Sequence, residues 1–178
     1  MAGQGRWGAG TAPDNGQMSS PSKPAPDTLT PEARLEEGGL HDVLGYQLAQ
    51  ASLLTDQRFA SAVGQPTGLG QVEFTLLHLI KQNAAVTPSR LARALAVSMP
   101  AITVWMGKLE QRGLITRRRS ATDRRSAHFE VTAEGLALVT QAMAAVLAEE
   151  EQLLAHLSVA ERAMLLELLR KVARQRKA

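Results

Sequence analysis

Apolar residues recur at three- and four-residue spacing along most of the chain after residue 40, which is the pattern of amphipathic helices. The first run predicts a helix over residues 40–63, and the turn-rich segment 64–70 ends it. Near the C-terminus, Thr132 and Ser158 are each placed to cap a further long helix. The second predicted helix has these apolar residues on one face: Val72, Leu76, Leu79 and Ile80.

Between these long helices, the sequence predicts two short helices that lie close together. Thr87 and Pro88 form a helix-start signal, and the helix they begin ends near Ala96. Ser98 is the next predicted N-cap, and its helix ends at Gly113, which suits a left-handed C-terminal position. Two helices joined by about three residues are the size of a helix-turn-helix, although an ordinary helical hairpin has the same spacing.

The segment that follows predicts a β-hairpin of two short strands, residues 115–119 and 127–131. The second strand alternates apolar Phe129 and Val131 with polar neighbours, which is the period of a half-buried strand. A hairpin directly after the second helix of a helix-turn-helix is a wing. We therefore predict a mostly α-helical protein with a small β-hairpin wing, that is, a winged helix-turn-helix plus a helical dimerisation domain.

This order of elements divides the chain into three parts. Residues 1–37 are rich in Gly, Pro and Ser and predict a disordered tail, in which Thr30 and Pro31 favour one short helix to Glu37. Residues 65–132 form the predicted DNA-binding domain. Residues 38–64 and 133–178 form the predicted dimerisation region, because their apolar stripes exceed what a small winged module needs. A symmetric homodimer would bury them, and a compact monomer with folded-back helices is the alternative.

The distribution of charge in the predicted hairpin favours DNA as the partner of this architecture. The net charge of the 178 residues is only +3, but five arginines crowd the hairpin, with Asp123 the only acid opposing them: Arg117, Arg118, Arg119, Arg124 and Arg125. Guanidinium groups at this density repel one another and favour phosphate as a partner, whereas the alternative is a solvated basic turn. Asp123 can hold Arg125 extended, as insertion into a narrow A·T minor groove requires, and the alternative is a weak surface ion pair.

The second short helix has one apolar side, which predicts core packing, and one narrow side that fits a major groove. On the narrow side, Thr103 can bond a base edge or touch a thymine methyl, and Lys108 suits phosphate or guanine. Backbone N–H groups at the two helix starts can hold phosphate. The predicted DNA-contacting residues are Ser89, Ser98, Pro100, Thr103, Val104, Lys108, Arg118, Arg119, Asp123, Arg124 and Arg125.

Other classes of function find no support in the residues. The chain has no cysteine, which excludes disulfides and thiolate metal sites. Its histidines stand far apart without metal-ligand spacing, and no nucleophile motif, phosphate loop or paired-carboxylate site is present. We therefore expect that the protein is not an enzyme and that it binds no metal ion and no cofactor. No secretory signal or bilayer-length apolar run is visible, so a cytoplasmic location is expected.

The segment 86–135 resembles the DNA-binding module of the MarR family. The matching stretches are VTPSRLARALAVS, AITVWMGKLEQRGLI and TDRRSAHFEVTAEG. The wing of that family has Asp-x-Arg followed by Thr-x-x-Gly, which correspond here to Asp123, Arg125, Thr132 and Gly135. The order of the flanking helices also matches, over about residues 40–174.

The resemblance implies a homodimer with interlocked first and last helices, which binds double-stranded DNA at a pseudopalindromic operator. Such proteins are usually repressors, and many release DNA on binding phenolic or aromatic acids. The implied effector pocket lies between the dimer helices and the winged module, with these candidate lining residues, for which core packing is the alternative: His41, Tyr46, His78 and Trp105. Val104 departs from the polar or basic residue common at its position.

The prediction is a sequence-specific transcription regulator, a dimeric repressor released by a small effector. The alternative is a non-sequence-specific architectural protein that binds DNA or RNA, because the groove-facing side of the second helix has few polar groups. The ratio of specific to competitor binding at fixed salt separates the two.

Overall fold

The computed structural model describes residues 28–119 and 127–176. The chain divides into a first segment that extends to Gln47 and a larger unit from Leu48 onward, and each is described by itself. Within the described residues, no helix combines the length and the apolar character needed to cross a bilayer.

The first segment contains a tight turn where a short helix was expected. Ala33 and Arg34 both have left-handed backbone conformations, with φ of 58° and 50°. The Thr30 hydroxyl accepts a hydrogen bond from the Leu35 N–H at 2.9 Å, which closes the turn. The predicted helix to Glu37 is therefore wrong, because two consecutive left-handed residues cannot continue a right-handed helix.

The first long helix begins and ends later than predicted. A 3₁₀ turn, Gly38–Asp42, precedes helix α1, Leu44–Phe59. The helical backbone then continues through a π-helical turn, Ala60–Gly64, and the short helix α2, Gln65–Thr67. It stops at Gly68, whose φ of +66° is left-handed. The break lies four residues after Gly64 because the proline of this segment occupies a first-turn position, where it needs no N–H.

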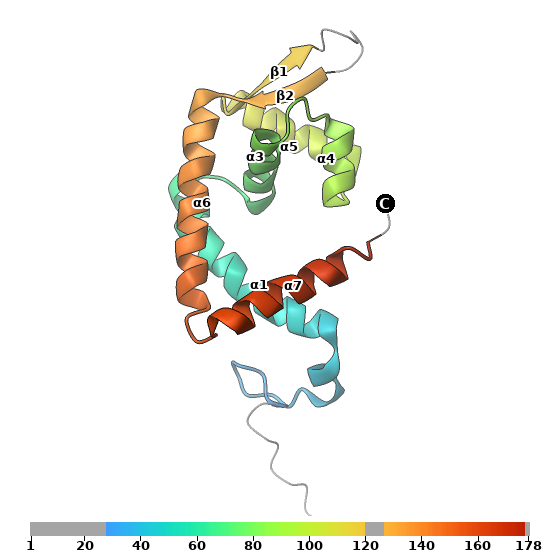
Figure 1. Cartoon of the computed structure of the whole chain (residues 1–178), viewed down its shortest axis with the longest axis vertical. Coiled ribbons are helices and arrows are strands. Elements are labelled where there is room, and N and C mark those ends of the chain that lie inside the picture. The colour runs from blue at the N-terminus through green and yellow to red at the C-terminus, as the bar shows by residue number, and fades with distance from the viewer. Residues whose placement is uncertain (1–27, 120–126, 177–178) are drawn as a thin grey trace, which may run out of the picture. The chain divides into compact units, whose positions relative to one another are not determined.

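The predicted helix-turn-helix is confirmed, with almost the predicted bounds. Helix α3, Gln71–Gln82, is followed by α4, Pro88–Leu95, and α5, Met99–Gln111. Figure 1 shows α3, α4 and α5 gathered beneath the hairpin at one end of the larger unit.

The predicted hairpin is also present. Strand β1, Ile115–Arg119, pairs antiparallel with β2, Ala127–Val131. Val86 adds an isolated bridge to Phe129 in β2, so the hairpin is also joined to the connection between α3 and α4. From the hairpin, α6 (Ala133–Leu153) leads away toward the last helix (Figure 1).

Three of the predicted N-caps form. The hydroxyls of Ser98, Thr132 and Ser158 accept hydrogen bonds from backbone N–H groups of α5, α6 and α7 (Val159–Ala173). Ser158 also donates its hydroxyl and its N–H to the Glu161 carboxylate, and these hydrogen bonds lower the pKa of that carboxyl. Thr87 stands at the predicted cap position of α4 but makes no capping bond.

A single cluster of buried side chains joins α3, α4, α5, α6 and the hairpin. Ile115 and Phe129 supply the hairpin's part of it, and half-buried Trp105 packs against it, as predicted for the apolar side of α5. The largest fully buried side chains are Val63, Leu69, Leu76, Leu77, Leu91, Ile102, Leu109 and Val139.

A close backbone contact lies where the hairpin meets α6. Gly113 ends α5 with the predicted left-handed φ, +70°. The Thr132 N–H donates to Leu114 O at 3.1 Å, and the Thr132 hydroxyl donates to Gly113 O at 2.7 Å. A Cβ built on Gly135 would lie 2.0 Å from Leu114 O. Only glycine allows the first turn of α6 to approach this carbonyl so closely.

We expect Gly135→Ala to destabilise the fold by more than about 2 kcal/mol, because the backbone contact cannot yield without shifting α6. Chemical denaturation followed by circular dichroism measures the change. Ala137→Ser, which adds one atom at an exposed position of the same helix, is the control. Equal stability of the two variants would contradict this account of Gly135.

Candidate nucleic-acid interface

The connection between α4 and α5 is short and well defined. Ala96 takes a left-handed conformation, φ 53°, at the C-cap of α4. The Val97 N–H then donates to Ala92 O at 3.0 Å, and Ser98 opens α5. The three-residue turn expected of a helix-turn-helix is therefore formed by one left-handed residue, one apolar residue and one cap.

The outward side of α5 is exposed along its length. Pro100, Thr103, Val104 and Lys108 are all exposed, and Val104 retains 57% of its surface. The Thr103 hydroxyl donates to Met99 O at 2.9 Å, so its proton is already engaged. This side therefore presents small and apolar groups, with Lys108 as the one cation among the four.

The two serines predicted to mark phosphate sites are both exposed, but their hydroxyls have partners. Ser98 Oγ accepts the Ala101 N–H at 3.4 Å. Ser89 Oγ lies 3.2 Å from the Thr87 hydroxyl. Their contribution to phosphate binding would come chiefly from the N–H groups of the first helical turns.

The hairpin places its arginines on two faces. Arg118 lies opposite His128 on one face, and Arg117 lies opposite Phe129 on the other. Arg118 Nε is 3.2 Å from the Glu130 carboxylate, and His128 Nε2 is 3.4 Å from it. Glu130 therefore opposes the cluster, so the expectation that only Asp123 does so is wrong. Because both partners are largely exposed, the Arg118 pair is worth under about 1 kcal/mol and can be exchanged for phosphate.

Arg117, on the face of the hairpin that looks toward α5, lines a cavity of about 260 Å³ between the two elements. Thr103 and Gly107 of α5, Pro88 of α4 and Phe129 of β2 line the same cavity. Sequence reasoning counted Arg117 in the hairpin cluster but did not select it as a DNA contact. The signal was available in the two-residue alternation of β1, which places Arg117 on the same face as buried Ile115.

The tip of the hairpin carries the remaining predicted contacts. Asp123, Arg124 and Arg125 lie outside the described residues. Of Arg119, the structure gives the backbone, which pairs with Ala127 at the end of the ladder. The predicted Asp123–Arg125 pair therefore stays a prediction.

Arg112 is a positioning residue that sequence reasoning missed. Its two terminal nitrogens donate to Thr67 O at 2.8 Å and Gly68 O at 3.0 Å, where α2 ends. A guanidinium at a helix C-terminus satisfies carbonyls that have no intrahelical partner. The contact ties the end of α5 to a loop 44 residues earlier, and no local pattern could have indicated it.

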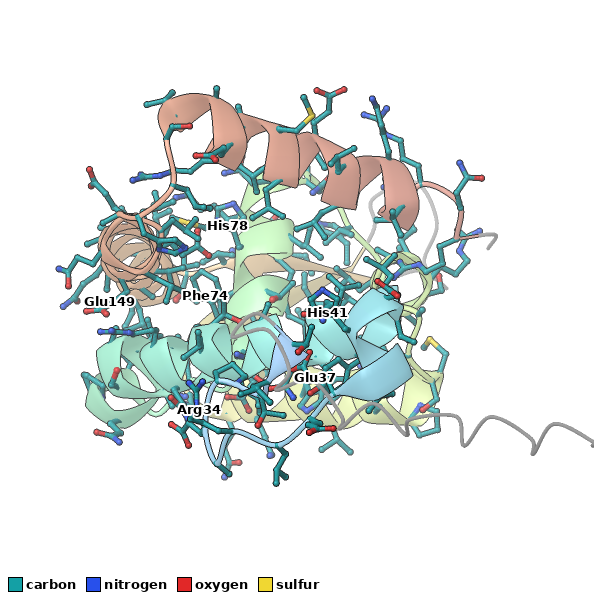
Figure 2. The ribbon with its side chains drawn as sticks, turned by 90° about the horizontal axis from the view of Figure 1, so that it is seen from below. Arg34, Glu37, His41, Phe74, His78 and Glu149 are labelled. Atoms are coloured by element: carbon teal, nitrogen blue, oxygen red, sulfur yellow. The ribbon has the colours of Figure 1, made fainter. Side chains whose placement is uncertain are left out.

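The four candidate effector residues have separate environments. In the first segment, His41 Nδ1 lies 3.4 Å from Glu37 Oε2 (Figure 2). Tyr46 OH donates to Glu37 Oε1 at 3.0 Å, so Glu37 joins the two. Sequence reasoning missed Glu37, although its four-residue spacing to His41 was a usable signal. The other two candidates belong to the larger unit, where Trp105 packs half-buried against the core.

His78 lies in a row of aromatic rings that α3 forms with the last residue of α1. Its ring centroid is 6.4 Å from that of Phe74, one turn earlier on α3 (Figure 2). The Phe74 centroid is 5.5 Å from that of Phe59. Nδ1 of His78 is buried and has no hydrogen-bond partner among the residues that the structure describes. Such an atom is costly to leave unpaired, which makes the row a candidate ligand-binding surface.

Comparison with known proteins identifies the architecture. The MarR family profile matches residues 69–127, which span α3 to the hairpin. A putative transcriptional regulatory protein for the hcr operon of Thauera aromatica is 31% identical over 153 residues, which cover 86% of this chain and 90% of that protein. This chain belongs to the MarR family of transcription regulators. Its fold is the winged helix-turn-helix of that family, as predicted.

Two further relatives connect sequence with solved structures. The repressor CouR, solved bound to a 23-mer DNA duplex, matches with a TM-score of 0.73 and 31% identity over 78% of this chain and 98% of that chain. The repressor Rv2887 of Mycobacterium tuberculosis is 32% identical over 65% of this chain and 82% of its own length. Its complex with salicylic acid matches with a TM-score of 0.59 and 30% identity over 72% and 95% of the two chains.

Proposed function

We propose that this regulator is a homodimeric repressor that binds a pseudopalindromic operator through α5 and the hairpin and leaves it when a small aromatic acid binds. The observation that carries the DNA part is the exposed, groove-sized side of α5 beside a hairpin with three consecutive arginines. The DNA complex of the similar repressor CouR supports it. The proposal assigns no catalytic reaction to the chain, and it places the protein in the cytoplasm.

In this proposal α5, the first turns of α4 and α5, and the hairpin each contact a different part of the duplex. Thr103, Val104 and Pro100 on α5 meet base edges, while Lys108 meets phosphate or guanine. The first turns at Ser89 and Ser98 hold phosphates. The hairpin residues follow the backbone into the minor groove: Arg118, Arg119, Asp123, Arg124 and Arg125.

The wing contact is tested by Arg125→Ala on an operator obtained by in vitro selection. We expect a loss of about 1–3 kcal/mol in operator binding with the thermal unfolding curve unchanged. Fluorescence anisotropy at fixed salt measures it, with Arg34→Ala, at an exposed position of the first segment, as control. Unchanged affinity would remove the wing from the mechanism, and equal binding to random duplex would favour the architectural alternative.

The dimer proposal rests on apolar side chains that remain exposed on the terminal helices. On α7, Val159 is 84% exposed and Leu168 50% exposed, and on α1 Leu53 is 56% exposed. Exposed apolar area of this extent marks an interaction surface. We propose that residues 38–64 and 133–178 form the dimerisation region around the DNA-binding domain, residues 65–132.

Leu168→Glu is expected to convert the dimer to monomer, because it introduces a charge into the proposed interface at a position that is exposed within one chain. Sedimentation velocity measures the change, and operator affinity should fall with it. Gln82→Glu introduces the same charge at the exposed end of α3, outside the proposed dimerisation region, and is the control. A wild-type chain that sediments as a monomer at all concentrations would rule out binding to two half-sites.

The effector proposal takes its chemistry from two similar proteins. Rv2887 has been solved with salicylic acid and CouR with p-coumaroyl-CoA. The unpaired Nδ1 of His78 next to the Phe74 ring supports an aromatic ligand with a polar group at this row. Trp105, which belongs to the same unit as His78, is a further candidate contact. His41 and Tyr46 belong to the first segment and are kept as separate candidates.

His78→Phe retains an aromatic ring and removes the nitrogen. We expect it to weaken the release of operator by salicylate about fivefold or more, with operator affinity unchanged, because one hydrogen bond to the ligand is lost. Salicylate titration of the fluorescent operator complex measures this, and His156→Gln, at an exposed position, is the control. Equal release by the variant and the wild type would exclude His78.

A further inference from the structure

The outward side of α5 contains a glycine that the described part of the chain does not itself require. Gly107 lies in the interior of α5 with ordinary helical backbone, and a Cβ there would meet nothing within 4 Å. Glycine is the least favourable residue in a helix interior after proline, because it loses the most conformational freedom. The reason for a glycine at this point is therefore sought outside the chain.

Other glycines of the same module show what an internal reason looks like. Gly113 takes a left-handed φ of +70°, which other residues rarely adopt. Gly135 allows the contact with Leu114 O described above, where a Cβ would lie at 2.0 Å. Gly107 has neither property, so its missing Cβ has no steric role among the described residues. What the missing Cβ does allow is a closer approach of another molecule to α5.

The neighbours of Gly107 indicate the chemistry of that molecule. Thr103 and Val104 precede it by one turn on the same side of α5, because residues three and four apart are neighbours on a helix. Val104 leaves 57% of its surface exposed, and the Thr103 hydroxyl proton is engaged by Met99 O. The surface formed by Thr103, Val104 and Gly107, here called the α5 face, is uncharged and largely apolar.

Base edges in the major groove offer hydrogen-bond donors and acceptors, and only one of them offers an apolar group, the C5 methyl of thymine. Phosphate and guanine call for cations or several donors, which the three residues of the α5 face do not provide. The cations nearest to the face are Lys108, the next residue of α5, and Arg117, which lines the same cavity as Thr103 and Gly107. We propose that the α5 face reads thymine methyl groups in the major groove and that Gly107 is a specificity residue, because its missing side chain lets α5 approach them. This inference rests on the proposed operator binding.

Deoxyuridine tests the inference directly, because it pairs as thymine does and lacks the methyl group. The full-length protein is titrated against its in vitro-selected operator with each thymine replaced in turn. We expect at least one position in each half-site to weaken binding about fourfold, the change that corresponds to one buried methyl-sized group. The ratio of the two dissociation constants is the readout.

Two variants then assign the effect to the α5 face. Gly107→Ala should raise Tm by about 2–4 °C through its better helix propensity and weaken operator binding about tenfold. In Gly107→Ala and in Val104→Ala the thymine-to-deoxyuridine ratio should fall toward one. Gly45→Ala is the matched control, because its Cβ also meets nothing within 4 Å and it lies outside the DNA-binding module. It lies in the proposed dimerisation region, so the control is judged by the thymine-to-deoxyuridine ratio, which a change in dimer stability leaves unaltered. That variant should keep the wild-type ratio.

The outcomes separate the inference from the function on which it rests. A wild-type protein that binds its operator with no deoxyuridine-sensitive position overturns thymine reading by the α5 face. A Gly107→Ala protein that is more stable and binds the operator as tightly as the wild type overturns the role of Gly107. If selection yields no preferred DNA at all, the proposed operator binding fails, and the inference fails with it.

Discussion

The contact between the first turn of α6 and the backbone of Leu114 determines how the parts of the DNA-binding module are held. Two connections of the chain meet here, the one between α5 and β1 and the one between β2 and α6. Thr132 bonds the carbonyls of Gly113 and Leu114, and Gly135 removes the side chain that would separate the two backbones. Because backbone meets backbone, there is no flexible side chain to absorb a displacement. The direction of α6 and the position of the C-terminal end of α5 therefore cannot change independently of each other.

The two proposed DNA-reading elements differ in electrostatics. The hairpin carries consecutive arginines whose attraction to phosphate is long-range and weakened by salt. The exposed side of α5 is almost uncharged before Lys108, so it contributes short-range shape and apolar contact. Glu130 moderates the hairpin, because it gives Arg118 a carboxylate partner when no phosphate is near. In the proposed function, affinity and discrimination therefore come from different elements of one small module.

The elements that depend on local signals were predictable from the sequence. Ser98 and Gly113 mark the start and the end of α5, because a cap depends only on residues close to it in the chain. The apolar–polar alternation around Phe129 predicted the range of the second strand correctly. The features that sequence reasoning missed depend on partners far along the chain or on a conformation without a residue signature. Arg112 meets carbonyls 44 and 45 residues away, and Ala33 and Arg34 are left-handed although neither is glycine.

The proposed site was predictable in class and less so in detail. The hairpin arginines and the exposed side of α5 follow from spacing alone. The pairing of Arg118 with Glu130 spans twelve residues and depends on the register of the two strands. No single residue in the sequence indicates that register. Glu37, which joins His41 and Tyr46, was hidden because the segment was read as a tail without structure.

The π-helical turn Ala60–Gly64 inserts one extra residue into an otherwise continuous helical run. One residue corresponds to a rotation of about 100° around a helix axis, so the apolar stripe changes phase at this turn. Before it, Leu53 and Leu54 remain exposed, whereas within it Val63 is completely buried in the core. The same helical run thus has apolar residues that stay exposed before the π-helical turn and an apolar residue that packs in the core within it. The surface offered to a partner copy can vary without any change in the residues that anchor the DNA-reading module.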